Sequence, residues 1–345
     1  MSADTPTMVD WGLAVQLGAR IAGDGPKVSA AEAAQAVAEL RDGAARSTDY
    51  VGDFTSLDAP ADTAPVLVVD RLGWVQANAD GFAKIINPVA DKLAGRKGVP
   101  KGLTKAIGSR VTGAEVGALL GFLATRVLGQ FDPFHEPHGR LLLVAPNIVH
   151  VERQLEVDPT DFRLWVCLHE ETHRVQFTAV PWLRDHLFAE MTLLIDSVEP
   201  QRMLDGGLKR IGELVKGDGG SLLEVMGSPE QQEILDRITG VMSLLEGHAD
   251  FVMDGVGPSV IPTVRAIRKK FTRRRQGVGA LDKMLRRLLG MDAKMAQYRD
   301  GAAFVRHSVG AVGMSDFNAV WAAAENLPSK AEISDPAAWV ARVHG

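Results

Sequence analysis

The sequence is poor in cysteine, in tyrosine and in long apolar runs. Its 345 residues include one cysteine, Cys167, so the chain can form no internal disulfide and no cysteine-rich zinc knuckle. A lone cysteine is typical of a reducing compartment. The first 15 residues contain no basic segment followed by an apolar run, as a signal peptide would. We therefore expect a cytoplasmic protein.

Charge and hydropathy argue against two further classes. The chain has 38 Lys and Arg residues against 43 Asp and Glu, a formal net charge of −5, which is unlike a protein that coats nucleic acid. The most apolar stretch, residues 113–131, has only ten uncharged positions between Glu115 and Arg126, whereas a membrane span needs roughly 20. Glycines recur there at every fourth position from Gly113 to Gly121, so we expect a buried helix closely approached by another helix. Neither a nucleic acid nor a membrane is an expected partner.

One segment, residues 265–275, is strongly basic, with seven Lys or Arg residues in eleven positions. Such a run can bind phosphates or an acidic partner. In a chain of net negative charge we favour a solvated helix face balanced by acids elsewhere. The sequence has no GxxxxGK[ST] loop, so nucleotide hydrolysis has no support.

Periodic segments rich in alanine and leucine predict a mainly α-helical fold. Four helix starts have the capping-box form, at Ser29 with Glu32, Thr112 with Glu115, Ser221 with Glu224, and Ser228 with Gln231. Residues 41–62 are polar and weakly periodic, and they are the best candidate for a boundary. We therefore predict an N-terminal helical segment over residues 1–60 and one domain over residues 61–345, with a single continuous domain as the alternative.

The main exception to the helical pattern lies in residues 139–157. Apolar and β-branched residues cluster there without a helical period, which predicts one or two strands. Asp158 then offers an N-cap and Pro159 a first-turn residue. The following pattern is helical up to Pro181. The sequence thus predicts a small β element immediately before a long helix.

That helix contains HExxH, with His169, Glu170 and His173 in the motif positions. A random match would occur in about one such chain in a hundred, even before requiring that it lie on a helix. Residues four apart project from one helix face, so both imidazoles can bind one metal ion. Glu170 is placed to take a proton from water that the metal activates, without itself being a ligand.

Two histidines do not complete a catalytic zinc site, which uses three protein ligands and one open position. The metzincin pattern is excluded because Gln176 and Ala179 stand where it needs Gly and His. The better third ligand is Glu246, which forms ExxxD with Asp250 on a predicted helix. Asp250 is then expected to accept the second ring N–H of a ligand histidine and to fix its orientation.

Four segments together resemble a known family: HEETHRVQF, LLEGHADFVMDGVG, AQYRDGAAFV and VWAAAENLP. They are similar to the actinobacterial zincin-like family of hydrolases or zinc-dependent metalloproteases, some members of which are linked to biosynthesis of a deazaflavin coenzyme. The resemblance covers most of the chain and implies a mainly α zincin-like fold of the gluzincin type. It implies Zn²⁺ bound by His169, His173 and Glu246, with Glu170 as the general base and a peptide or other amide as substrate.

Several alternatives remain for the site residues. A di-iron centre is disfavoured because no second ExxH motif occurs. His248 competes with Glu246 as a ligand, yet two residues along a helix it points elsewhere and is more suited to line the pocket. A tetrahedral oxyanion needs a donor besides the metal. Tyr298, His248 and His307 are the candidates for that donor.

Two rivals to an active hydrolase also follow from the sequence. In the first, the same ligands hold together a catalytically silent, metal-stabilised scaffold or partner protein connected with deazaflavin coenzyme biosynthesis. In the second, the C-terminal segment from Ser329 to Gly345 plugs the site, and its deletion would expose activity.

Overall fold

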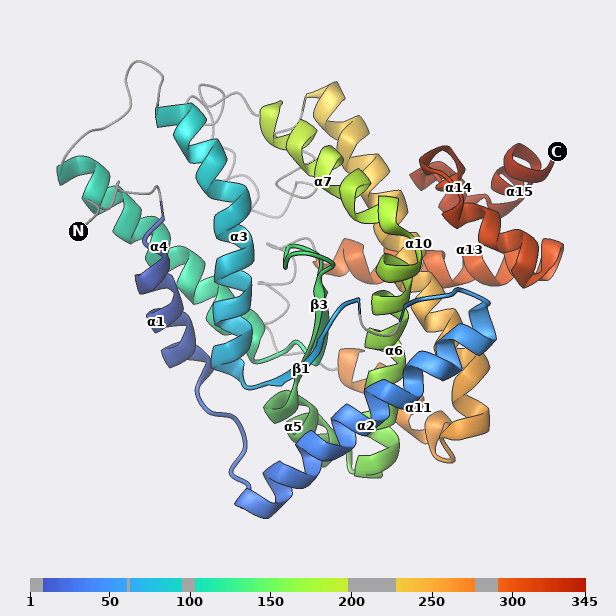
Figure 1. The fold of residues 1–345 in the computed structure, drawn as a ribbon, viewed down its shortest axis with the longest axis horizontal. Helices are drawn as coiled ribbons and strands as arrows, with labels where there is room; N and C mark the ends of the chain where they lie inside the picture. The colour runs from blue at the N-terminus through green and yellow to red at the C-terminus, as the bar shows by residue number, and fades with distance from the viewer. Residues whose placement is uncertain (1–8, 61–62, 95–102, 198–227, 277–290) are drawn as a thin grey trace. The chain divides into compact units, whose positions relative to one another are not determined.

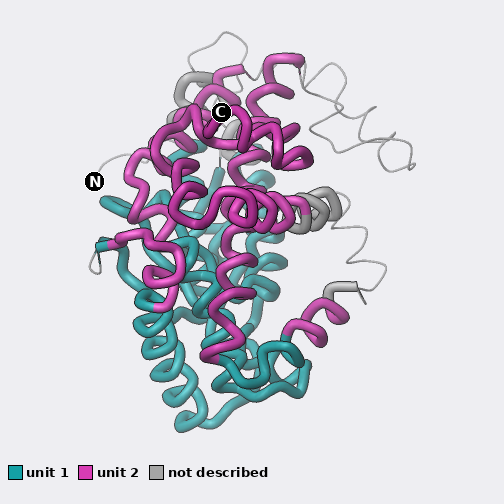
Figure 2. The backbone as a smooth tube through the Cα atoms, turned by 90° about the vertical axis from the view of Figure 1, so that its right-hand side faces the viewer, with its two compact units in different colours: residues 1–49, 60–174, 261–267 teal, residues 50–59, 175–260, 268–345 magenta. Residues whose placement is uncertain are grey.

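The computed structural model describes residues 9–60, 63–94, 103–197, 228–276 and 291–345 (Figure 1). Helices dominate these ranges, and their β structure is one sheet of three short strands. The mainly α fold with a small β element is thereby confirmed. Two compact units share the chain: residues 1–49, 60–174 and 261–267 form unit 1, and residues 50–59, 175–260 and 268–345 form unit 2 (Figure 2). The division at residue 60 stays a prediction, because each unit is built from several segments.

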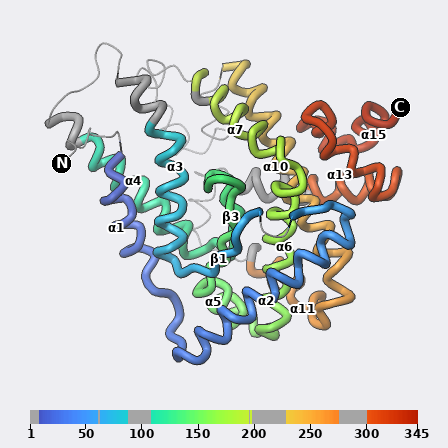
Figure 3. Tube along the Cα trace, in the orientation of Figure 1, coloured from blue at the N-terminus to red at the C-terminus, as the bar shows by residue number. Residues whose placement is uncertain are grey.

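The elements that lie wholly or mainly in unit 1 are α1 (Trp11–Ala22), α2 (Ala30–Thr55), β1 (Val66–Val69), α3 (Arg71–Ala94), α4 (Leu103–Ala124), β2 (Gly129–Asp132), β3 (Arg140–Val144), α5 (Ala145–Leu155) and α6 (Pro159–Ala179). Those of unit 2 are α7 (Pro181–Asp196), α10 (Pro229–Val260), α11 (Val264–Gln276), α13 (Met291–Phe317), the 3₁₀ turns η1 (Asn318–Trp321) and η2 (Ala324–Asn326), α14 (Lys330–Ser334) and α15 (Pro336–His344). Figure 3 traces their order along the chain.

The sheet has the strand order β1-β3-β2, with β1 parallel and β2 antiparallel to the central β3. Strand β3 is the apolar run RLLLV, of which Leu141 to Val144 are buried. The sequence prediction for residues 139–157 is correct only for this strand. The rest of that segment is α5, which has Pro146 in its first turn and buries Ile148, Val151 and Leu155 at helical spacing.

Close helix packing in unit 1 confirms the expectation for the glycine-rich stretch. A Cβ atom at Gly113, Gly117 or Gly121 of α4 would lie 2.5 to 2.7 Å from a backbone oxygen of residues 10–18 on α1 and its N-cap. The three glycines therefore let the two backbones touch. Within the described residues, no helix is long and apolar enough to cross a membrane.

The helix starts are partly as predicted. Capping boxes begin α2 at Ser29 and α10 at Ser228, where each backbone N–H bonds to the Glu32 or Gln231 side chain. The capping box at Thr112 is wrong, because α4 begins nine residues earlier and the Thr112 hydroxyl donates to a carbonyl of the preceding turn. The start at 221–224 lies outside the described residues. Helix α2 occupies the polar segment 41–62 as far as Thr55.

Unit 2 has its own apolar core, formed by α7, α10, α13 and the C-terminal turns and helices. Trp339 of α15 is fully buried there against Phe304 and Phe317, and its Nε1 donates to the carbonyl of Asn326 at 2.8 Å. Residues of the C-terminal segment thus belong to the core of unit 2. Deleting this segment would expose the core of unit 2. Loss of stability would then accompany any activity that the deletion reveals.

Candidate metal centre

Helix α6 begins as its sequence predicts. The Asp158 side chain accepts a hydrogen bond from the backbone N–H of Asp161 at 2.9 Å, which caps the helix. The Asp161 carboxylate in turn accepts from the backbone N–H and the hydroxyl of Thr263, at 2.9 and 2.6 Å. The first turn of α6 is therefore held at both its backbone and its side chains.

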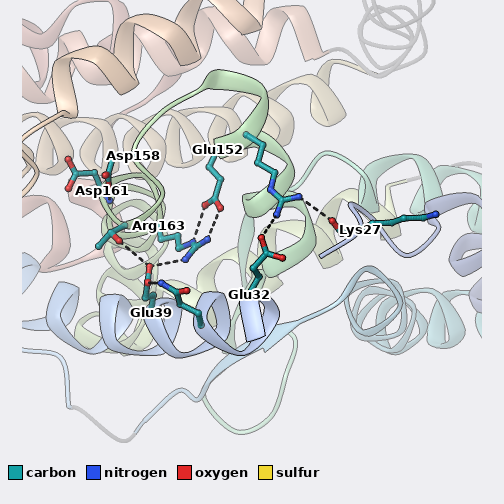
Figure 4. A network of polar contacts seen from close by, with 10 residues as sticks. Lys27, Glu32, Glu39, Glu152, Asp158, Asp161 and Arg163 are labelled. Atoms are coloured by element: carbon teal, nitrogen blue, oxygen red, sulfur yellow. Dashed lines mark hydrogen bonds and ion pairs between the residues drawn. The ribbon is translucent and has the colours of Figure 1, made fainter. Parts of the chain in front are cut away.

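A buried charge network holds the next turn of α6 (Figure 4). Arg163 donates two hydrogen bonds to Glu152 of α5, at 2.6 and 3.0 Å, and one to Glu39 of α2, at 2.8 Å. Burial raises the pKa of Glu152, and Arg163 opposes that rise. One guanidinium thus joins three helices just before the HExxH motif.

The face of α6 that contacts α2 consists of Arg163, Cys167, Glu171 and Arg174, whose spacing of four, four and three residues follows one side of a helix. Cys167 Sγ lies 3.5 Å from the carbonyl oxygen of Leu40. Arg174 donates to Glu171 at 2.6 Å and to the Thr48 hydroxyl of α2 at 3.0 Å. This buried face sets the rotation of α6.

Burial of this face also alters the pKa values of two of its side chains, Cys167 and Glu171. Burial raises the pKa of the Cys167 thiol, so it stays neutral. This agrees with the expected role of a small buried residue. Burial likewise raises the pKa of Glu171, and the adjacent Arg174 lowers it only in part.

His169 and His173 lie on a different side of α6 and are half-buried. Their Nε2 atoms are 3.3 Å apart and their rings are nearly perpendicular, at 87°. Two nitrogen ligands at about 2.05 Å from zinc, separated by a tetrahedral angle, would also stand about 3.3 Å apart. The pair therefore fits one shared zinc ion.

Glu246 of α10 completes a set of three candidate ligands. It is half-buried like the two histidines, and one ligand atom from each of His169, His173 and Glu246 lies within 4.8 Å of the others. Two imidazoles and a carboxylate are a donor set that suits a catalytic zinc ion. The residues present therefore fit the group that the motif implies.

Glu170, between the two histidines in sequence, is 7% exposed. Its side chain lies against the backbone of Gly129, the first residue of β2. The local sequence of β2 carries no signal that would have revealed this contact.

Sequence reasoning also missed the role of Gln176, which it used only to exclude the metzincin pattern. Gln176 is fully buried. Its Nε2 lies 3.0 Å from the carbonyl oxygen of Leu245 and 2.9 Å from Nδ1 of His248. The side chain three residues after His173 thus bonds to the residue just before Glu246, which ties the register of α6 to that of α10.

His248 is fully buried, with its ring 5.3 Å from that of Trp321 and stacked at 6.1 Å on that of Phe317. This places it in the core of unit 2. Its role as oxyanion donor stays a prediction. The side chain of Tyr298 lies outside the described part of the structure, and His307 is exposed on α13.

The structure gives Asp250 a different partner from the expected ligand histidine. Its carboxylate lies 3.8 Å from Nη2 of Arg268, which also donates to the Asp250 carbonyl at 3.2 Å and to the Asp254 carboxylate at 2.8 Å. The support of a ligand histidine by Asp250 stays a prediction. Arg268 belongs to the basic run, which forms α11 and buries Ile267 and Phe271 on its apolar side.

Comparison with known proteins gives two matches. The model of a family described as zincin-like metallopeptidase matches residues 9–340. A crystal structure described as "a putative hydrolase with a novel fold", from Chloroflexus aurantiacus, is 31% identical and superposes with a TM-score of 0.72. The match covers 97% of this chain and 98% of that one. Among curated proteins, none matches.

Proposed function

Because the chain belongs to the zincin-like metallopeptidase family, we propose that it is a zinc-dependent hydrolase whose substrates are peptides or related amides. His169, His173 and Glu246 would hold the ion. The observation that carries the proposal is the approach of their three ligand atoms to within 4.8 Å of one another. The described hydrolase from Chloroflexus aurantiacus supports the same reaction class.

A zinc ion at this site would act as a Lewis acid and lower the pKa of water towards about 7. The protein's own part falls to Glu170. A carboxylate oxygen of Glu170 would accept a proton from the attacking water and then return it to the nitrogen of the leaving group. The low exposure of this side chain favours the reaction, because fewer solvent molecules compete for its oxygen atoms.

The arrangement of α6 supports this division of roles. The face that contacts α2 fixes the rotation of the helix, and with it the side from which the two histidines project. Gln176 bonds to the residue before Glu246, which restrains the third ligand along α10. Such preorganisation would keep the metal ligands and the general base in place while the bound substrate reacts.

The direct test replaces Glu170 by Gln. This change keeps the shape of the side chain and removes its basicity. We expect zinc content by elemental analysis and the melting temperature to stay near those of the unchanged protein. Turnover of a peptide library should fall by about 100-fold to 10,000-fold.

Glu115→Gln is the matched control, because Glu115 is exposed on α4 and the same chemical change there should alter nothing. If Glu170→Gln leaves turnover unchanged, the base assignment is wrong. If the purified protein binds zinc yet cleaves no member of the library, the scaffold alternative is favoured. Absence of zinc binding would contradict the metal site itself.

A further inference from the structure

Gly129 of β2 has the side chain of Glu170 in the space where its own side chain would stand. A Cβ atom at Gly129 would lie 2.5 Å from both Cγ and Cδ of Glu170 and 2.9 Å from its Oε1. Carbon atoms in contact are normally about 3.5 to 4.0 Å apart. No side chain, even a methyl group, can therefore coexist with the present position of Glu170.

Backbone conformation does not explain this glycine. The described glycines with a positive φ are Gly23, Gly25, Gly139 and Gly313, and Gly129 is not among them. It is paired with Leu143 in the sheet, where any residue could adopt the extended conformation. Glycine within a strand weakens the strand and often marks a point of close approach. What approaches here is the carboxylate side chain of the HExxH motif.

The contact differs from the approaches at the three glycines of α4, where backbone atoms lie nearest. At Gly117 an added Cβ would meet a backbone carbonyl of α1, which cannot move without shifting the helix. At Gly129 it would meet the distal part of a single side chain, which can rotate away. A substitution at Gly129 should therefore displace the Glu170 carboxylate and leave the fold intact.

We propose that Gly129 is a positioning residue for the general base, holding the Glu170 carboxylate in its working place by leaving it room beside β2. This inference rests on the proposed function of Glu170. The Glu170 side chain is nearly enclosed, so a methyl group on one side pushes it towards another position. A displacement of about 1 Å is enough to reduce catalysis on the order of 100-fold.

The test compares Gly129→Ala with Glu170→Gln in protein loaded with zinc and, separately, with cobalt(II). For Gly129→Ala we expect an unchanged metal stoichiometry and a melting temperature equal to or above that of the unchanged protein. Its kcat should fall on the order of 100-fold at constant KM. The visible absorption bands of bound cobalt should shift in the same direction as in Glu170→Gln. Gly310→Ala is the control, because nothing lies within 4 Å of the added Cβ.

A double-mutant cycle separates positioning from a general structural effect. Gly129→Ala added to Glu170→Gln should lower kcat no further, because the base is already gone. Independent, additive losses would overturn the proposal. If Gly129→Ala lowers the melting temperature, the stability of Gly129→Ala/Glu170→Ala decides: recovery to the level of Glu170→Ala supports a clash with Glu170, and no recovery overturns it.

Failure of this inference can be told from failure of the proposed function. If Glu170→Gln changes neither the cobalt spectrum nor turnover, the role of Glu170 itself is wrong. If Glu170→Gln changes both but Gly129→Ala changes neither, Glu170 keeps its role and Gly129 loses its own.

Discussion

Replacing Arg163 by Met tests how firmly α6 depends on its buried charge network. The Glu152 side chain is 4% exposed, and Glu39 is 25% exposed, so the substitution leaves one buried carboxylate without its cation. Breaking a buried ion pair from one side costs about 3 to 5 kcal/mol. We expect about 3 kcal/mol, at the low end of that range, because Glu39 can be solvated and Glu152 can take up a proton.

The same reasoning predicts how this loss depends on pH. Burial raises the folded-state pKa of Glu152 above its ordinary value, and without Arg163 the rise is larger. A carboxyl group with a raised pKa loses stability as the pH climbs from its unfolded pKa through its folded pKa. The deficit of Arg163→Met should therefore be smaller at pH 5 than at pH 8.

Urea unfolding followed by circular dichroism at both pH values measures the effect, with equal slopes required for the comparison. Arg163→Met/Glu152→Met is the control, since an apolar pair in place of a buried ion pair is often neutral or stabilising. It should recover most of the loss. A single variant within about 0.5 kcal/mol of the unchanged protein, as for a surface site, would refute the reasoning. So would a double variant no more stable than the single one.

Four further substitutions are expected to have distinct effects. Gln176→Leu keeps the volume but removes the donor from buried His248, so it should cost about 1 to 3 kcal/mol in urea unfolding and weaken zinc binding measured by competition with a chelator. Hydrogen bonds from Arg342 and Ser329 outweigh burial and lower the pKa of Glu332, so its contribution is present above the ordinary pKa and lost as the pH falls. Glu332→Gln should thus lower the melting temperature more at pH 7 than at pH 3; an equal effect at both would contradict this. Gly117→Val should cost about 1 to 3 kcal/mol because its side chain meets backbone, whereas Gly108→Ala, in open space on the same helix, should stabilise the protein by up to about 1 kcal/mol.

The parts of the site that could be predicted from the sequence are those fixed by local chemistry. Asp158 and Pro159 mark the start of α6, Pro181 follows its end, and the motif spacing brings two imidazole nitrogens to 3.3 Å. These features depend on helix capping and helical period alone. Glu246 is indicated by its ExxxD spacing with Asp250 and by the resemblance to the zincin-like family, and its ligand role remains a proposal.

The parts that could not be predicted depend on partners distant in sequence. Glu39 lies 124 residues from Arg163, and no local pattern connects them. The strands β1 and β2 have four residues each, too few to show a period. The sequence pattern does not reveal α5, because its β-branched residues hide a helical spacing that only burial makes visible. The role of Gly129 has no signal in the sequence, because the sequence does not show which glycine leaves room for a distant side chain.

The two sides of helix α6 have different roles. One side contacts α2, and the other carries the two candidate ligand histidines, so substitutions on the same side should have similar effects. Residues on the α2 face of this helix, such as Cys167 and Glu171, are buried, so changes there should alter stability first and metal affinity only through loss of the folded state. Changes to His169 or His173 should do the reverse, because half-buried imidazoles contribute little to the core. Glu170 falls in neither class. It is as buried as a core residue, and its side chain occupies the space beside Gly129 of β2, so its packing sets the position of its carboxylate.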